Sequence, residues 1–398
     1  MTPSHPRVVA VTERAIAAAR ASRPPCSSVE RRIPLSRYLG EEELAWEREA
    51  LFRRLPLVVA HASELGGPGA CLPLDVAGVP VLLTRDASGT ARAFLNACRH
   101  RSTRLASGPC EIRKALVCPY HAWTYGLDGT LIHVPHAEAF PESARANLVQ
   151  LPLAERHGLL WVTPSPGDSP PGLLEGTAEV GEELEALGLP GHVLFRRATS
   201  TRRANWKLIA EAFLEAYHVA RLHRDTLYPF FVDSVAITER AGDHIRSATA
   251  RRAAREAPAG TPLFDLVTLS YFLFPNTTVI FHPDFASVIT YCPLAPDRLQ
   301  WHHSMLVPRA PDTEKAQLHY ERAYQLIEEQ VFAREDLFIA EEMQAGMAAR
   351  AGPDLVFGGL ETAVHWFHDT IEAHRARTRG HSVPAMLSDR VVPPDPPR

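Results

Sequence analysis

The sequence of 398 residues has little lysine, little net charge and no long apolar run. Lysine occurs only at Lys114, Lys207 and Lys315, so arginine supplies almost all of the 42 basic residues. With 46 acidic residues the net charge is −4, which gives no bulk basic field to attract nucleic acid or an anionic membrane. No apolar run approaches the roughly 18 residues that span a bilayer, and the start of the chain lacks the apolar segment of a secretory signal. We therefore expect no nucleic-acid partner, no membrane partner and a cytoplasmic location.

Cysteine is also scarce, with six residues in the whole chain. That number is too small for a disulfide framework in a chain of this length, so we expect a reducing compartment and cysteines that act as metal ligands. The length predicts two to three domains. A composition of 45% hydrophobic and 22% charged residues excludes a disordered or fibrous chain.

The pattern of apolar residues changes along the chain. Short β-like runs separated by turn residues fill positions 55–162, which indicates a small β-sandwich or barrel. A helix is predicted over 206–222, and helical patterns return over 311–350 and 360–377. Between these helices lie five strand-like runs, at 232–238, 266–274, 277–282, 287–292 and 299–307. A block of strands followed by long helices is typical of an α+β domain.

Two cysteines and two histidines form the first candidate metal site. Cys98 and His100 are followed, after 17 intervening residues, by Cys118 and His121. One thiolate and one imidazole from each of two loops suit a [2Fe–2S] cluster in which two cysteines hold one iron and two histidines the other. Zinc also binds two cysteines and two histidines, but zinc fingers group the cysteines together and the histidines together. The mixed loops therefore favour the cluster over zinc.

The residues around these ligands resemble a known family. Segments 98–101 (Cys-Arg-His-Arg) and 118–125 (Cys-Pro-Tyr-His-Ala-Trp-Thr-Tyr) are similar to the Rieske domain of Rieske non-haem iron oxygenases, in the large (alpha) subunit of the aromatic ring-hydroxylating dioxygenase family. Rieske proteins of respiratory complexes carry an extra cysteine in each loop, whereas Tyr120 occupies the second loop here and Cys110 falls outside the first. Ser102 stands where the family commonly has glycine. Trp123 either packs over the cluster or is an ordinary core residue.

His218 and His223 form the second candidate site. With 19 histidines in the chain, about one pair at this spacing is expected by chance. The preceding Asn205-Trp206-Lys207 and the Glu215-x-Tyr217-His218 core, however, resemble the iron-binding helix of the same oxygenases. Two histidines and a carboxylate form the facial triad of non-haem Fe(II) oxygenases. Residues five apart lie about 140° apart around an α-helix, so we expect the helix to end or widen into a π-type bulge between the two histidines.

The third ligand is expected to be a carboxylate far along the chain. Asp336 is the best match, because segment 334–346 resembles the family's Glu-Asp sequence with its downstream Gln-x-Gly. Glu335, Glu341 and Glu342 are rivals for this role.

Two further positions are matched to the family. Glu215 stands where an acidic residue bridges to a Rieske histidine across a subunit boundary; the alternative is an ordinary helix carboxylate. Ala212 stands where the family often has asparagine.

The resemblance implies an α+β fold, with an all-β Rieske iron–sulfur domain and a helix-grip catalytic domain in which an antiparallel sheet and a long helix enclose the iron. We expect an N-terminal segment packed on the catalytic domain (1–45), the Rieske domain (46–163), a linker near 164–171, the catalytic domain (172–385) and a mobile tail (386–398). The implied cofactors are a [2Fe–2S] cluster and a mononuclear Fe(II). Three such chains would form a ring in which each cluster faces the iron of its neighbour.

The implied function is that of a terminal oxygenase, which uses O2 to mono- or dihydroxylate a small organic, typically aromatic, substrate. The sequence has no G-x-G-x-x-G and no P-loop, so electrons would come from a separate ferredoxin or NAD(P)H-dependent reductase. Two alternatives stay open: a monooxygenase or demethylase of a non-aromatic or quaternary-ammonium substrate, similar to choline monooxygenase, and an electron-transfer protein with a defunct iron site. Candidate pocket residues are Phe264, Tyr271, Phe272, Phe281, Phe285, Tyr291 and Phe332.

Overall fold

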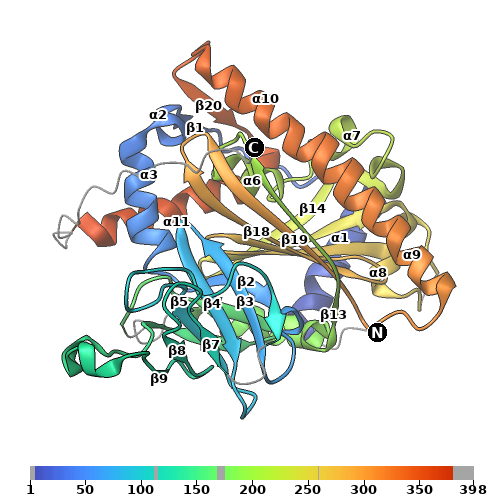
Figure 1. Ribbon diagram of the computed structural model, residues 1–398. Helices are drawn as coiled ribbons and strands as arrows, with labels where there is room; N and C mark the ends of the chain where they lie inside the picture. The colour runs from blue at the N-terminus through green and yellow to red at the C-terminus, as the bar shows by residue number, and fades with distance from the viewer. Residues whose placement is uncertain (1–4, 112–114, 168–174, 259, 380–398) are drawn as a thin grey trace.

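The computed structural model describes residues 5–111, 115–167, 175–258 and 260–379 (Figure 1). The predicted tail 386–398 and part of the predicted linker lie outside the described residues. A β-rich body lies at the lower left of Figure 1, and a larger sheet with long helices lies above and to its right. This arrangement confirms the predicted α+β class, with a small all-β part and an antiparallel sheet that carries a long helix.

The lower body consists of three small sheets. The largest has the strand order β10-β5-β4-β3-β6, and the two others have the orders β11-β12-β2 and β7-β8-β9. The strands are β2 (Leu57–His61), β3 (Ala70–Val76), β4 (Val79–Arg85), β5 (Ala91–Leu95), β6 (Cys110–Glu111), β7 (Leu116–Val117), β8 (Thr124–Tyr125), β9 (Leu131–His133), β10 (Gln150–Leu151), β11 (Leu153–Arg156) and β12 (Leu159–Val162).

One disulfide departs from the expectation for the cysteines. Cys71 on β3 and Cys110 on β6 lie directly opposite each other in the antiparallel register, with 5.2 Å between their Cα atoms, and their sulfurs are bonded. The two residues are 39 positions apart, so only the sheet register brings them together. The expectation that the cysteines serve only as metal ligands was therefore wrong for this pair.

The larger sheet is antiparallel with the order β13-β19-β18-β17-β16-β15-β14. The five predicted strands are present as β14 (Phe231–Ala241), β16 (Val267–Leu273), β17 (Thr277–Phe281), β18 (Ala286–Ala295) and β19 (Arg298–Val307). Two strands were not predicted, β13 (Val193–Arg202) and β15 (His244–Arg251). Both are rich in small polar and arginine residues, so they lack the apolar alternation on which a strand prediction depends.

A long helical rod crosses this sheet from upper left to lower right in Figure 1. It is continuous through α9 (Glu314–Tyr324), a π-helical segment (Gln325–Asp336) and α10 (Leu337–Ala348), as the helical pattern over 311–350 predicted. Ile327, Val331 and Phe332 of the π-helical segment are buried in one hydrophobic cluster with Trp301 and Met305 of β19. This packing fixes the middle of the rod against the sheet.

Other helices close the edges of the larger body. Helix α1 (Pro6–Ala21) buries Val8, Val11 and Ala15 in a cluster that includes Ile237 of β14 and Ala248 of β15. Helix α3 (Glu41–Glu47) and the C-terminal α11 (Thr362–Arg379) lie on the left in Figure 1. Short strands β1 (Arg31–Pro34) and β20 (Asp354–Phe357) pair beside α10.

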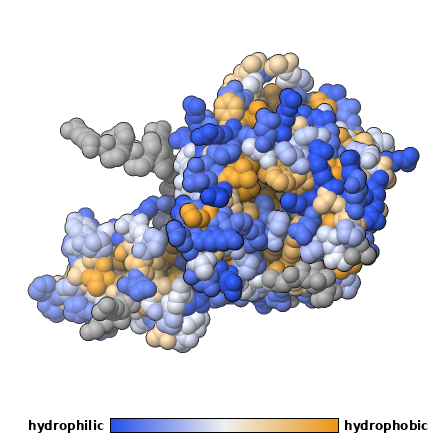
Figure 2. Space-filling view, turned by 90° about the vertical axis from the view of Figure 1, so that its right-hand side faces the viewer, coloured by the Kyte–Doolittle hydropathy of each residue, from blue (hydrophilic) through white to orange (hydrophobic). Residues whose placement is uncertain are grey.

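The right-hand side of the molecule carries α7 (Val219–Leu222) and α9 (Figure 1). Seen from that side, apolar side chains gather in the middle of the upper part of the face, within a border of hydrophilic ones (Figure 2). Among the described residues, no helix is long and apolar enough to cross a membrane.

Candidate metal centres and substrate pocket

The first metal motif lies on two loops of the lower body, one after β5 and one after β7. Cys98 and Cys118 are buried and are not joined in a disulfide. The rings of His100 and His121 lie 4.6 Å apart, and within the described part of the chain the Nδ1 atom of each is buried without a hydrogen-bond partner. The loops thus bring together two free thiols and two unpartnered imidazole nitrogens, which fits the donor set of a Rieske [2Fe–2S] cluster.

Each loop closes with a left-handed residue after its histidine. Ser102 has φ +58° and donates its N–H to the carbonyl of Cys98 at 2.9 Å. Ala122 has φ +55° and donates its N–H to the carbonyl of Cys118 at 3.0 Å. Positive φ angles favour glycine, which has no side chain to clash with the backbone. The backbone conformation at position 102 therefore explains why glycine is common there in the family.

Aromatic side chains support the two loops. The Trp123 ring is buried and stacks on His100, with 5.0 Å between centroids and 7° between planes. The hydroxyl of Tyr125 lies 3.4 Å from the Cys98 sulfur and accepts the N–H of Arg99 at 3.1 Å. Trp123 is therefore at once a core residue and a wall beside a predicted ligand.

His218, His223 and Asp336 lie together although they come from distant parts of the chain. One ligand atom from each lies within 4.8 Å of the others. The Nε2 atom of His223 is 3.0 Å from Asp336 Oδ1, and that of His218 is 3.8 Å from the same oxygen. Two imidazoles and one carboxylate on a common face can hold a mononuclear iron and leave other positions open.

The predicted single helix over 206–222 is wrong. Two short helices replace it, α6 (Trp206–Ala212) and α7, with a turn between them. His218 is the residue before α7, and His223, with φ −91° and ψ 31°, follows its last residue outside helical geometry. The end of α7 at Leu222 therefore lies between the two histidines, as their spacing required. The π-helical geometry occurs instead in the segment that ends at Asp336.

The imidazole nitrogens that face away from the shared centre are each held by a glutamate. Glu335 Oε2 lies 2.7 Å from His223 Nδ1 and also accepts the Thr226 hydroxyl at 2.8 Å. Glu215 contacts His218 Nδ1 and accepts the His218 N–H at 3.1 Å. Such outer carboxylates fix the orientation and tautomer of metal-binding histidines. Glu335, a rival for the third ligand, thus contacts the ring of the predicted ligand His223.

These carboxylates change the protonation of the rings. Burial alone would lower the pKa of His223, but hydrogen bonds and charge from Asp336 and Glu335 outweigh it and raise the pKa to about 9. Burial likewise opposes the charged form of His218, yet Glu215 and Asp336 raise its pKa above the ordinary value. Without a metal, His223 therefore carries a proton at neutral pH, and the pKa of His218 is shifted in the same direction.

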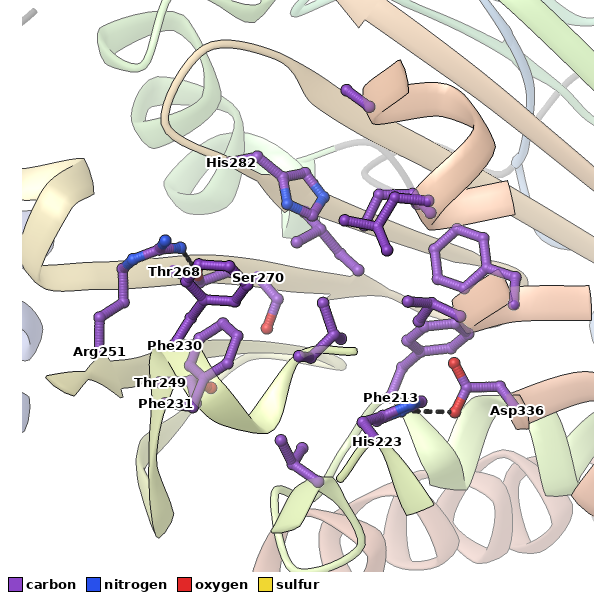
Figure 3. A pocket seen from close by; sticks show the side chains of 18 of the residues that line it. Phe213, His223, Phe230, Phe231, Thr249, Arg251, Thr268, Ser270, His282 and Asp336 are labelled. Atoms are coloured by element: carbon purple, nitrogen blue, oxygen red, sulfur yellow. Dashed lines mark hydrogen bonds and ion pairs between the residues drawn. The ribbon is translucent and has the colours of Figure 1, made fainter. Parts of the chain in front are cut away.

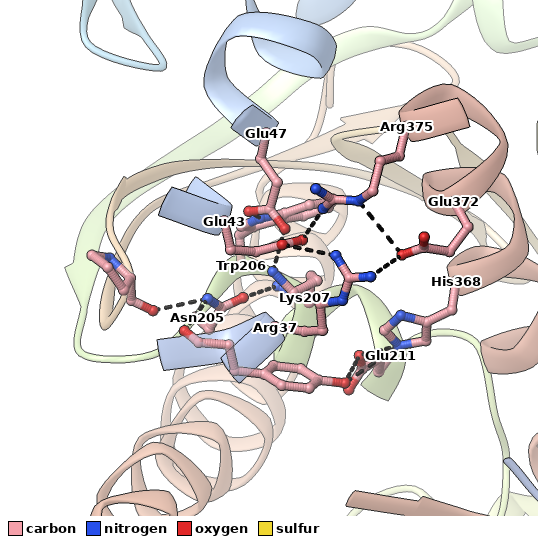
Figure 4. A network of polar contacts seen from close by, with 12 residues as sticks. Arg37, Glu43, Glu47, Asn205, Trp206, Lys207, Glu211, His368, Glu372 and Arg375 are labelled. Atoms are coloured by element: carbon pink, nitrogen blue, oxygen red, sulfur yellow. Dashed lines mark hydrogen bonds and ion pairs between the residues drawn. The ribbon is translucent and has the colours of Figure 1, made fainter. Parts of the chain in front are cut away.

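A buried polar network fixes the start of α6 (Figure 4). The Asn205 side chain accepts the N–H of Lys207 at 3.0 Å and donates to the carbonyl of Tyr38 at 2.8 Å. Trp206 donates its indole N–H to Glu47 at 2.7 Å, and the Lys207 ammonium pairs with the same carboxylate. The Asn-Trp-Lys segment that resembles the family thus anchors the helix that leads to the ligands.

The far end of α6 is held in the same way. Glu211 accepts the Tyr38 hydroxyl at 2.7 Å and lies 2.9 Å from His368 Nε2, in a buried cluster that joins α6 to α11 (Figure 4). His368 thus has a structural role.

A cavity of about 470 Å³ opens onto the His218, His223 and Asp336 centre (Figure 3). Its walls are mostly apolar and include Phe213, Leu227 and Ile280. Of the seven aromatic residues predicted to line the pocket only Phe285 and Phe332 do so, while Phe213, Phe230 and Phe231 were missed. Ala212 also lines the cavity, so its short side chain leaves room where an asparagine would project.

Two protein-family models match separate parts of this chain. Residues 56–151 match the Rieske [2Fe–2S] domain, and residues 193–376 match the ring hydroxylating alpha subunit (catalytic domain). The chain belongs to the Rieske ring-hydroxylating oxygenases. It therefore combines a Rieske [2Fe–2S] domain with a catalytic domain of the mononuclear iron type.

Individual relatives of this oxygenase chain agree with that assignment. It is 34% identical over 212 residues to the carnitine monooxygenase oxygenase subunit of Escherichia coli K12, a match that covers 52% of this chain and 54% of the relative. It is 27% identical over 330 residues to the corresponding subunit of Acinetobacter baumannii, covering 79% and 84%. The match to the Escherichia coli relative thus spans only about half of that protein's length.

The fold is also that of a solved relative. A quaternary ammonium Rieske monooxygenase, solved in complex with an inhibitor, superposes with a TM-score of 0.77 at 21% identity, over 89% of this chain and 97% of that one. This likeness shows the common fold of the two proteins.

Proposed function

We propose that this chain is the terminal oxygenase of a multicomponent system, which hydroxylates a small organic substrate with O2 and electrons from a separate ferredoxin or NAD(P)H-dependent reductase. The observation that carries the proposal is the apolar cavity that opens directly onto His218, His223 and Asp336. When bound, the cluster supplies single electrons and the mononuclear iron supplies O2 activation.

The chain's own residues have separable tasks in this proposal. Cys98, His100, Cys118 and His121 hold the cluster, and the facial triad holds the iron. Phe213 and Phe332, which are in edge-to-face contact with 5.8 Å between ring centroids, line the cavity and exclude water from the substrate. The cavity fits a single small molecule, because binding pockets for such ligands are typically about 300–1,000 Å³.

Two substrate classes follow from this function. The carnitine monooxygenase relatives favour a monooxygenase of a quaternary-ammonium substrate, whereas the apolar walls favour an aromatic or other apolar substrate. An electron-transfer protein with a defunct iron site is disfavoured, because the triad residues and the pocket are all in place.

Iron content and O2 uptake test the function. Purified protein should hold about three irons per chain, two in the cluster and one mononuclear. The Asp336→Ala variant should lose about one of the three and all substrate-dependent O2 uptake, while it keeps the visible absorption of the cluster. A protein that binds a single zinc and no iron after anaerobic reconstitution would contradict the proposal.

We further propose a homotrimer in which each cluster serves the iron of a neighbouring chain. The separation of the two centres supports this, because β7–β9 lie at the lower left of Figure 1 and α7 at the upper right. Glu215, which contacts His218, is the proposed bridge to a Rieske histidine of the next chain.

Mixed assembly tests the trimer. His100→Ala and His218→Ala chains should each be inactive alone, and their co-expression should restore a fraction of wild-type turnover. Restoration requires that intact clusters and intact iron sites on different chains meet. If no mixing ratio restores activity, transfer occurs within each chain.

A further inference from the structure

Arg251 is the last residue of β15 and lines the substrate cavity. Figure 3 places it at the end of the pocket opposite His223 and Asp336, beside Thr268 and Phe231. Its guanidinium lies 5.4 Å from the Phe231 ring centroid, and its Nη1 donates to the Thr268 hydroxyl over a long 3.4 Å. A half-buried cation thus stands at the far wall of an otherwise largely apolar cavity.

This guanidinium has no carboxylate partner among the described residues, since no acidic oxygen lies within 4.0 Å of it. Arg246 on the same strand, by contrast, is paired with Glu179 and Glu183. A guanidinium has five N–H donors, so one long hydrogen bond to Thr268 leaves most of them free. Burial is the main influence on Arg251 and lowers its pKa, while Asp265 acts from a greater distance in the opposite direction.

The acidic side chains of the same cavity are all engaged. Glu215 contacts His218, and Asp336 lies 3.0 Å from His223. The third, Asp284, pairs with His319. Arg251 is therefore the one charged side chain of the described cavity wall that contacts no ionisable partner, which favours an anionic ligand over a cationic one.

We propose that Arg251 is the anion subsite of this oxygenase and that the substrate is a small organic carboxylate. Its carboxylate would be held by the two-pronged guanidinium, a geometry that arginine provides and lysine does not. Its apolar body would lie along Leu227 and Ile280 and present a carbon to the facial triad at the other end. The proposal rests on the proposed oxygenase function, because it names the substrate class of that site.

Binding of three matched probes tests the subsite. We would titrate the iron-replete protein, without O2 or reductant, with 3-phenylpropanoate, its neutral amide 3-phenylpropanamide and the cation phenethyltrimethylammonium, and follow each by calorimetry. The carboxylate should bind about 10- to 100-fold more tightly than the amide, as expected for a charge-assisted hydrogen-bonded pair. The Arg251→Gln variant should lose this preference while its affinity for the amide stays unchanged.

Two further variants separate the subsite from a general effect of charge or folding. Arg252→Gln removes an exposed arginine one residue along the chain, whose guanidinium lies over Tyr228 at 4.6 Å, and should leave all three affinities unchanged. Arg251→Lys keeps the charge without the fork and should retain part of the preference.

Several outcomes would overturn the subsite: equal binding of carboxylate and amide to the wild type, tightest binding of the cation, no carboxylate binding at millimolar concentration, or an Arg251→Gln variant that keeps the preference. The binding assay needs no turnover. Failure of the oxygenase function would show instead in the iron content and O2 uptake.

Discussion

The Glu335→Gln substitution tests how strongly an outer carboxylate supports the iron site. Glu335 Oε2 lies 2.7 Å from the Nδ1 atom of His223, a residue that is only 2% exposed. Glutamine keeps the size and an acceptor oxygen but removes the charge. Hydrogen bonds to charged groups contribute about 1.5–3 kcal/mol and neutral ones about 0.5–1.5 kcal/mol. The difference of about 1–1.5 kcal/mol corresponds to roughly tenfold in affinity, at the lower end of the 10- to 100-fold seen for such outer partners.

The assay is an anaerobic competition titration of the iron-free mononuclear site with Fe(II) and a chelator. Glu335→Gln should weaken Fe(II) binding about tenfold and Glu335→Ala more, with no change in cluster absorption. Glu342→Gln is the matched control, because Glu342 lies exposed on the adjoining helix and should leave the affinity unchanged. Wild-type affinity in Glu335→Gln would refute the assigned support of His223, and an equal loss in Glu342→Gln would assign the effect to helix charge.

Three more predictions concern the two centres. Glu215→Gln, measured at saturating Fe(II) so that weaker metal binding does not count, should lose at least tenfold in turnover; full turnover would place the electron bridge elsewhere. Fe(II) uptake by the iron-free site at pH 7.5 should release at least one proton into a weak buffer. His223, with a pKa of about 9, is protonated at that pH and must be neutral to bind metal. Above pH 10 the proton release should vanish. Ser102→Gly removes the strain of a side chain at φ +58°. It should raise the free energy of unfolding of the lower body by about 0.5–1 kcal/mol, since the left-handed strain exceeds the entropy that glycine adds to the unfolded chain. Chemical denaturation should show this increase in the free energy of unfolding.

The sequence predicted the fold class and the strands that carry branched apolar residues, but not all of the large sheet. Strand β15 reads His-Ile-Arg-Ser-Ala-Thr-Ala-Arg and forms because it pairs with β14 on one side and β16 on the other. That stabilisation comes from neighbours distant in the sequence, so no local pattern reports it. The omission also hid Arg251, because its position at the end of β15, which lies between β14 and β16, is what directs it to the cavity.

The pocket residues were mispredicted for a related reason. Strand β18 is buried at eight consecutive positions, so it shows no alternation that would separate an inward face from an outward one. Tyr291 on this strand is a core residue, and so is Tyr271 on β16, which is buried at six of its seven positions. Phe213, by contrast, lies in the turn that broke the predicted helix. A turn residue takes its direction from the backbone around it, which a helical pattern does not describe.

The adjacent pair Glu335 and Asp336 shows why one sequence could not rank the rival carboxylates by pattern alone. Neighbours on an α-helix point about 100° apart, so a simple count allows one of them to reach a metal and sends the other elsewhere. An imidazole, however, has two nitrogens on different sides of its ring, and the two carboxylates contact different ones: Asp336 lies 3.0 Å from Nε2 of His223, and Glu335 lies 2.7 Å from Nδ1 of the same ring. Both carboxylates therefore contact a single histidine. The position of each one on the helix determines which nitrogen of the ring is left for the other. The double variant Glu335→Asp with Asp336→Glu would keep charge and composition but should lose both contacts.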